Sequence, residues 1–239
     1  MRVHYIQHVA FEGLGAIQPY LQAQGHDLSV TRLYAGEHLP SVDTFDWLIA
    51  MGGPMGIYDY DEYSWLQTEK VFIKQAIDAG KTVLGVCLGA QLIADVMGGS
   101  GDKRAVYASK RKEIGWFDIQ CSPELQETVL DGVFPQTFEA FHWHGDTFDV
   151  PAGVKALGAS EACANQGFIY DNRVLGLQFH LETTPESAAA LIENCGDELD
   201  ASLSKQNSYV QLAKEMLADQ QRFSRLNQSM VKVLKALGA

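Results

Sequence analysis

Short apolar runs alternate with stretches of helical spacing over the first hundred residues of the chain. Four runs are apolar or β-branched, as is typical of strands buried in a parallel sheet: residues 2–8, 26–33, 46–51 and 82–86. Three stretches between or after them carry apolar residues every three or four positions and predict helices: residues 14–24, 64–79 and 88–97. This alternation predicts an α/β fold with a mostly parallel central sheet.

The predicted helices carry start and stop signals. Ser64 is a candidate N-cap of the second helix, and Gly98-Gly99 follows the third as a C-cap pair. Further on, Thr184 precedes Pro185, and Ser187 stands in the first turn, which predicts the start of another helix.

The pattern changes after residue 105. Short strands with turns between them are expected: residues 114–118, 138–142, 154–157, 166–170 and 174–179. They favour an antiparallel extension of a mixed sheet over further βαβ units. Residues 197–239 are helical and amphipathic, so we expect a domain over 1–195 and a C-terminal helical appendage over 196–239.

Composition excludes several classes of protein. The 239 residues carry 18 Lys+Arg against 30 Asp+Glu, a net charge of −12, which argues against nucleic-acid binding. No apolar stretch is long enough to cross a bilayer, and no secretory leader opens the chain. The 4 cysteines are scattered without a C-x-x-C pair, which argues against a zinc site or disulfide framework. We therefore expect a cytoplasmic protein without a membrane or nucleic-acid partner.

Cys87 stands between the apolar strand 82–86 and the helix 88–97, flanked by Gly85 and Gly89. A side chain on such a turn projects above the carboxyl end of the sheet, where open α/β sheets bind ligands. The N-terminus of the following helix favours the thiolate over the thiol. Most free cysteines merely pack in a core, so this position alone leaves inert packing as the simpler interpretation.

Two further turns change that interpretation. His180 and Glu182 follow the apolar strand 173–177, at the level of Cys87, and an extended chain puts both side chains on one face. They can serve as base and orienting carboxylate for a cysteine nucleophile, although a solvated strand end is the simpler alternative. Gly52-Gly53-Pro54 follows the strand 46–51, where backbone N–H groups can face an oxyanion or form a plain turn.

Together these motifs resemble the class I (triad) glutamine amidotransferase family, over about residues 2–194. Gly85-Val86-Cys87-Leu88-Gly89-Ala90-Gln91 matches the nucleophile motif, Gln178-Phe179-His180-Leu181-Glu182 the base motif, and Gly52-Gly53-Pro54 the oxyanion turn. The resemblance implies a three-layer, flavodoxin-like sandwich. It also implies a Cys87-His180-Glu182 triad, an oxyanion hole from the N–H groups of Gly53 and Leu88, and substrate contacts from Gly52, Gln91 and His144. No cofactor is expected.

The motifs Lys112-Glu113-Ile114-Gly115-Trp116 and His144-Gly145-Asp146 resemble the stand-alone branch similar to GMP synthase. In that branch a serine often precedes the His-Gly-Asp segment, whereas this chain has Trp143. The departure concerns the contacts to the α-groups of glutamine and leaves the triad motifs intact.

Two other patterns carry less weight. Gly13-Leu14-Gly15 follows a strand, but Gln18 stands where a dinucleotide fingerprint needs its third glycine. His142, His144 and Asp146 have metal-like spacing but no accompanying partner motif, so we expect a pocket wall or plain packing and no metal.

Three functions fit this sequence. In the first, the protein hydrolyses L-glutamine through a Cys87 thioester and hands ammonia to a separate synthetase subunit. The chain has no nucleotide-binding loop for an acceptor domain of its own. The second is a free-standing hydrolase of small γ-glutamyl metabolites. The third is a non-catalytic thiol-sensing or binding protein on the same fold, against which the intact Cys87, His180 and Glu182 count.

Overall fold

The central sheet of the molecule has seven strands in the order β2-β1-β3-β4-β10-β9-β7. The computed structural model describes residues 1–98, 104–199 and 209–239. Five of the strands run parallel to one another: β1 Arg2–Gln7, β2 Asp27–Arg32, β3 Trp47–Ala50, β4 Thr82–Val86 and β10 Val174–Leu177. Their order is that of a flavodoxin-like sheet, so the α/β prediction is confirmed.

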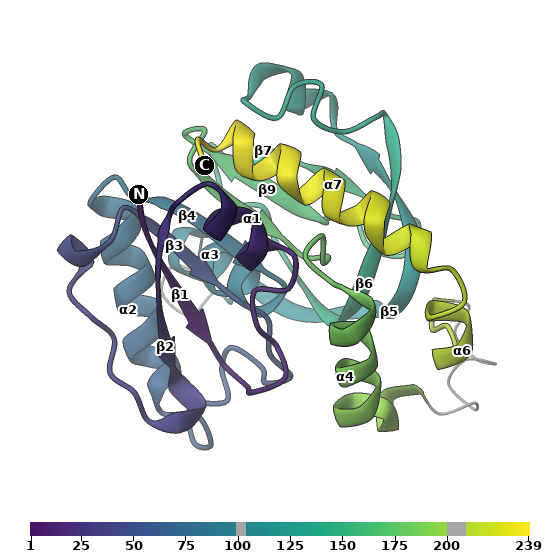
Figure 1. Cartoon of the computed structure of the whole chain (residues 1–239), viewed down its shortest axis with the longest axis horizontal. Coiled ribbons are helices and arrows are strands. Elements are labelled where there is room, and N and C mark those ends of the chain that lie inside the picture. Colours follow the sequence, from purple (N-terminus) through teal and green to yellow (C-terminus); the bar gives the residue numbers. More distant parts are fainter. Residues whose placement is uncertain (99–103, 200–208) are drawn as a thin grey trace.

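Helices cover both faces of the parallel strands, and this is why β3 and β10 are buried along their whole length. On one face, α2 (Trp65–Asp78) and α3 (Leu88–Gly98) share a core with alternate strand residues. On the other face, α1 (Ile17–Ala23) packs beside α7 (Gln220–Ala236), which runs as the yellow helix across Figure 1. The result is a three-layer sandwich.

The antiparallel part has two pieces. Strands β9 (Gly167–Tyr170) and β7 (Lys155–Ala156) extend the central sheet beyond β10. A second sheet, in the order β6-β5-β8, is dominated by a long hairpin of β5 (Val106–Cys121) and β6 (Thr137–Phe148), with β8 (Gly158–Ala159) at its edge.

The sequence predicts only the short segments 114–118 and 138–142 of this hairpin, and places them in the mixed sheet. That part of the prediction is wrong. The charged residues 109–113 fall inside β5, where the pairing with β6 shifts between Ala108 and Glu113. This irregularity breaks the alternation of apolar and polar residues by which a strand is recognised. The sequence therefore does not indicate the first half of β5 as a strand.

Helix boundaries agree with the sequence to different degrees. Thr184 caps α4 (Pro185–Cys195) in a capping box with Ser187, as expected. Ser64 occupies the N-cap of α2 but makes no capping hydrogen bond, and α1 is shorter than the predicted 14–24. The predicted C-cap residue Gly99 lies outside the described residues. The remaining short helices are η1 Leu33–Ala35, η2 Val42–Thr44, η3 Pro123–Glu127, η4 Gly196–Leu199 and α6 Ala213–Met216.

The C-terminal helix packs tightly on the rest of the molecule. Phe223 of α7 lies edge-on against Trp116 of β5, with 4.9 Å between the ring centroids. Further along α7, Met230, Val233 and Leu234 belong to the same buried core as the sheet. Residues 200–208, which fall within the predicted helical stretch 197–239, lie outside the described residues. Within the described ranges, no helix is both long enough and apolar enough to cross a membrane.

Candidate active site

Cys87 lies on a sharp turn between β4 and α3, with φ of +51°. Only a few non-glycine residues adopt this left-handed backbone, and it marks strain held in place by the surrounding structure. The turn needs small neighbours: a Cβ on Gly85 would lie 2.5 Å from the Gly89 carbonyl carbon, and one on Gly89 would lie 2.1 Å from the Ala50 oxygen. The local sequence therefore folds into a sharp strand–turn–helix elbow with Cys87 at its tip.

His180 and Glu182 follow β10, the neighbour of β4 in the sheet. A distance of 2.7 Å joins His180 Nδ1 to Glu182 Oε1, and both side chains are buried. The backbone N–H of His180 donates to the Phe141 carbonyl, and this hydrogen bond fixes the backbone position from which the imidazole projects. Burial lowers the pKa of His180, but the Glu182 carboxylate and the Cys87 sulfur outweigh it, so this pKa lies well above its ordinary value.

Cys87 and His180 line the same cavity, which has a volume of about 200 Å³. The sulfur donates to the Trp143 carbonyl at 3.5 Å and accepts from Gln178 Nε2 at 3.7 Å. His180 Nε2 is buried and makes no hydrogen bond to any described residue, so it stays available to a substrate. The Cys87 sulfur also raises the pKa of His180, so the two side chains interact and can serve as a nucleophile with its base.

Two buried residues that the sequence analysis missed hold the oxyanion turn. His8 Nδ1 donates to the Gly52 carbonyl at 3.0 Å, and its Nε2 lies 2.8 Å from Glu69 Oε1. The side chains of His8 and Glu69 are both fully buried. Because a peptide group is planar and trans, fixing the Gly52 carbonyl also fixes the Gly53 N–H, which points the opposite way. That N–H has no partner among the described residues.

The first turn of α3 supplies two more of the predicted residues. Leu88 opens the helix, so its N–H has no partner within it. Gln91 lines the cavity and donates from Nε2 to Gln178 Oε1 at 3.2 Å. Trp143, the residue that departs from the family pattern, also lines the cavity and donates from Nε1 to Glu198.

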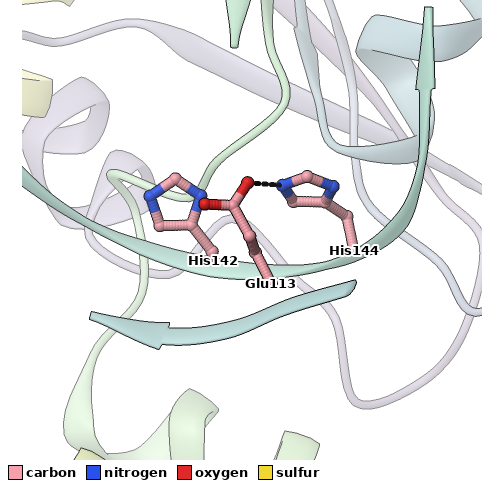
Figure 2. A group of neighbouring side chains, drawn as sticks. All are labelled: Glu113, His142 and His144. Carbon is pink, nitrogen blue, oxygen red and sulfur yellow. Dashed lines mark ion pairs between the residues drawn. The ribbon is translucent and has the colours of Figure 1, made fainter. Parts of the chain in front are cut away.

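His144 lines the cavity from β6 and rests on a buried carboxylate (Figure 2). Its Nε2 lies 3.2 Å from Glu113 Oε2, and its Nδ1 lies 3.0 Å from the carbonyl oxygen of Asp146. The sequence analysis groups His142, His144 and Asp146. In the structure the two histidines lie beside Glu113. Asp146 takes part only through its backbone carbonyl, the partner of His144 Nδ1.

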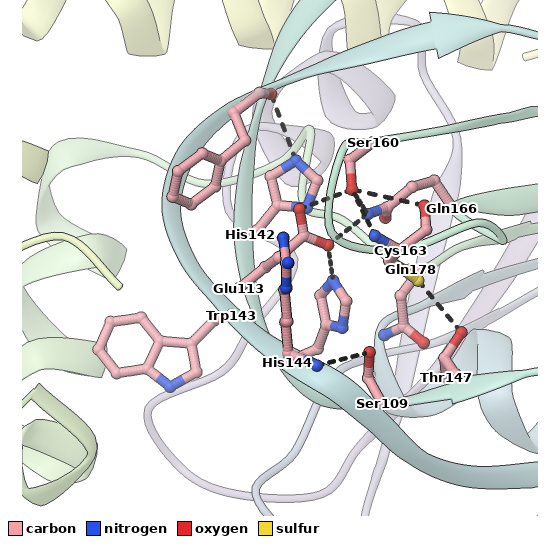
Figure 3. A network of polar contacts seen from close by, with 12 residues as sticks. Ser109, Glu113, His142, Trp143, His144, Thr147, Ser160, Cys163, Gln166 and Gln178 are labelled. Carbon is pink, nitrogen blue, oxygen red and sulfur yellow. Dashed lines mark hydrogen bonds and ion pairs between the residues drawn. The ribbon is translucent and has the colours of Figure 1, made fainter. Parts of the chain in front are cut away.

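Glu113, His142 and His144 are the described group whose donor atoms are close enough to hold a metal ion, all within 4.8 Å. Figure 3 shows that the carboxylate already has other partners, because Ser160 Oγ and Gln166 Nε2 each donate to it at 2.7 Å. Burial lowers the pKa of His142 to about 3, so this ring is neutral. We read the group as a hydrogen-bonded support for the His144 wall of the cavity.

The backbone around Glu182 is held by two segments far away in the sequence. Asn227 of α7 donates both amide hydrogens, to the carbonyls of Leu181 and Thr183, each at 2.9 Å. On the other side, Ala16 N–H donates to the Glu182 carbonyl at 2.9 Å. Gly15 has φ of +50°, and a Cβ there would lie 2.2 Å from the Glu182 carbonyl oxygen. Glycine at position 15 of the Gly13-Leu14-Gly15 pattern is thus required by this close approach.

Replacing Asn227 by alanine should lower kcat about tenfold while KM stays close to that of the wild type, because two hydrogen bonds beside Glu182 are lost. The free energy of unfolding should fall by about 1–3 kcal/mol. Steady-state kinetics and denaturant unfolding measure both. Asn194→Ala, which removes a bond within α4 only, is the matched control. An unchanged kcat in Asn227→Ala would show that α7 stabilises the fold without positioning the triad.

Comparisons with known proteins show what the chain is similar to. The family model for class I glutamine amidotransferases matches residues 14–199. The chain is 35% identical over 222 residues to the glutamine amidotransferase-like protein YfeJ of Salmonella typhimurium, covering 91% of this chain and 90% of that protein.

A solved glutamine amidotransferase from Thermotoga maritima superposes with a TM-score of 0.85 at 29% identity, covering 100% of this chain and 99% of that chain. A shorter match of 146 residues is 30% identical to the GMP synthase of Azoarcus sp., covering 57% of this chain and 25% of that enzyme. The chain therefore spans about a quarter of that synthase's length.

Proposed function

Because the chain belongs to the class I glutamine amidotransferase family, we propose that it hydrolyses the side-chain amide of glutamine through a thioester on Cys87. The observation that best supports this proposal is that a cysteine on a strained elbow and a histidine with a free Nε2 line one cavity, while a buried carboxylate contacts the other nitrogen of that histidine. Cysteine acyl transfer needs these groups in this relation.

In the first half-reaction the Cys87 thiolate attacks the γ-carbon, and a C–S bond forms. The carbonyl oxygen becomes an oxyanion that faces the N–H groups of Gly53 and Leu88. When this intermediate collapses, the C–N bond breaks and protonated His180 gives its proton to the departing nitrogen, so that ammonia leaves. Glu182 holds the imidazole in place and stabilises its cationic form.

In the second half-reaction water attacks the thioester while neutral His180 accepts one of its protons. The C–S bond breaks, glutamate leaves, and the thiolate and the imidazolium are restored. No cofactor is needed in either half.

The cavity suits a small substrate. Its volume of about 200 Å³ is below the range of drug-sized ligand sites and fits a single amino acid. We assign Gly52, Gln91 and the His144 wall to substrate binding, with Gln91 and His144 holding the α-amino and α-carboxylate groups. The four cysteines are free thiols, which fits a protein of the reducing cytoplasm.

The fate of the ammonia separates two versions of this function. The match to part of a GMP synthase supports transfer of the ammonia to a synthetase active site. A protein that acts alone on γ-glutamyl metabolites would release ammonia or an amine into solution.

The test is ammonia release from the purified protein, with glutamine and with a panel of γ-glutamyl compounds. We expect glutamate and ammonia from glutamine in equal amounts. Turnover that rises sharply with an added synthetase would support the subunit version, and full turnover without one would support the free-standing version. No release from glutamine or from any compound of the panel would contradict the proposal.

A further inference from the structure

We propose that the side of the cavity which receives the departing amine selects for positive charge. It accepts γ-glutamyl amides that release ammonia or an amine bearing a second, cationic ammonium group, and it discriminates against those that release an amino acid. This inference rests on the proposed function and names the substrate class of the same site. The residue that carries it is Glu12.

Glu12 reaches the cavity from the loop after β1 and lines it together with Cys87 and His180. Glycine at position 52 makes room for its carboxylate, because a Cβ on Gly52 would lie 2.3 Å from Glu12 Oε2. No described residue forms a hydrogen bond with this carboxylate.

The position of His180 shows which part of a substrate Glu12 meets. The same Cβ on Gly52 would lie 3.4 Å from His180 Cε1. The Glu12 carboxylate and the His180 imidazole therefore both lie beside Gly52. His180 must deliver its proton to the departing nitrogen. The group attached to that nitrogen therefore leaves into the space that Glu12 and His180 both border.

The charges around Glu12 leave it without a neutralising partner of its own. The groups that act on it are His180, His8, Glu182, Glu198 and Cys195. His8 is bound to Glu69, and His180 to Glu182. Lys112 is the lysine on the cavity wall, and Glu198 pairs with it while also accepting from Trp143.

A carboxylate on the departing amine, as in a γ-glutamyl peptide, would approach the partly buried Glu12 carboxylate across the cavity. Like charges repel across such a cavity more strongly than in bulk water, and opposite charges attract more strongly. A second ammonium group on the departing amine would be attracted instead. Ammonia, the product from glutamine, carries no group that could be repelled.

The selectivity should depend on pH in a defined direction. Burial raises the pKa of Glu12 to about 7, against the opposing effect of His180. Glu12 is therefore mostly protonated at pH 6 and mostly ionised at pH 8. The preference for the cationic substrate should grow across this interval. His180 acts on all substrates alike, so its titration cancels in the ratio of two kcat/KM values.

The experiment compares three γ-glutamyl amides of similar size: the 2-aminoethylamide, which is cationic, the propylamide, which is neutral, and γ-glutamylglycine, which is anionic. We expect kcat/KM at pH 8 to fall in that order, with at least about a tenfold ratio between cation and anion. The ratio should decline toward pH 6. Glu12→Gln should bring it close to one at every pH, whereas Glu193→Gln, an exposed carboxylate on α4, should leave it unchanged.

Several results would overturn the inference. One is a wild-type ratio near one at pH 8 with normal turnover of glutamine, which leaves the proposed function standing. Another is a large ratio that survives Glu12→Gln. Failure of every amide, glutamine included, would remove the proposed function and this inference with it. If Glu12→Gln does not fold, the pH dependence of the wild-type ratio decides, because a ratio constant from pH 6 to 8 contradicts a role for this carboxylate.

Discussion

Replacing Cys87 by alanine is expected to lower glutamine hydrolysis by at least about 10⁴-fold, because no thioester can form without the sulfur. Serine in its place should be nearly as inactive. A serine hydroxyl ionises far less readily than a thiol. The raised pKa of His180 favours an imidazolium, which stabilises a neighbouring thiolate. Both replacements are small, so the left-handed turn at Cys87 should persist. Glutamate release at saturating glutamine measures the effect.

Cys121→Ala is the matched control, because Cys121 is also a free thiol but lies at the end of β5, away from the cavity. It should keep turnover close to that of the wild type. Folding of each variant is checked by thermal unfolding. Alanine and serine variants of Cys87 that fold and retain wild-type turnover would exclude a thioester mechanism.

Replacing Glu182 by glutamine should reduce kcat by about 10³–10⁴-fold, since the amide no longer stabilises the imidazolium and can impose the wrong tautomer. The 2.7 Å contact from Glu182 to His180 Nδ1 is short and buried, so the negative charge of Glu182 acts strongly on the pKa of His180. Without it the pKa of His180 falls. The active pair, thiolate with imidazolium, then persists only to a lower pH.

The alkaline limb of kcat/KM should therefore move to lower pH in Glu182→Gln, in addition to the loss of rate. Glu186→Gln, an exposed position in the first turn of α4, removes the same charge nearby and should change neither quantity. A Glu182→Gln variant with an unshifted alkaline limb and near-normal kcat would show that this carboxylate does not act on the base.

The motifs around Cys87 and His180 could be read from the sequence because each is local. A strand, a tight turn and a helix start follow one another within a few residues, and glycine is needed where the backbone crowds. The sheet order then follows from the alternation of strands and helices, which makes the parallel part of the fold predictable.

The residues that support the site could not be found in this way, because they come from distant parts of the chain. His8 and Glu69 are 61 residues apart, and Asn227 is 46 residues from Leu181. Single polar residues in a helix or after a strand give no local signal of a buried partner. Glu12 is likewise an ordinary loop residue until the fold places it beside His180 and Gly52.

The most direct test of the central claim is covalent labelling with a glutamine-analogue electrophile, followed by intact mass and peptide mapping. The proposed mechanism predicts one adduct per chain, on Cys87, and protection by glutamine. Cys195 also lines the cavity, but burial raises the pKa of its thiol to about 11, so it should stay unlabelled. An adduct on Cys195 in place of Cys87, or no adduct at all, would contradict the claim that Cys87 is the nucleophile.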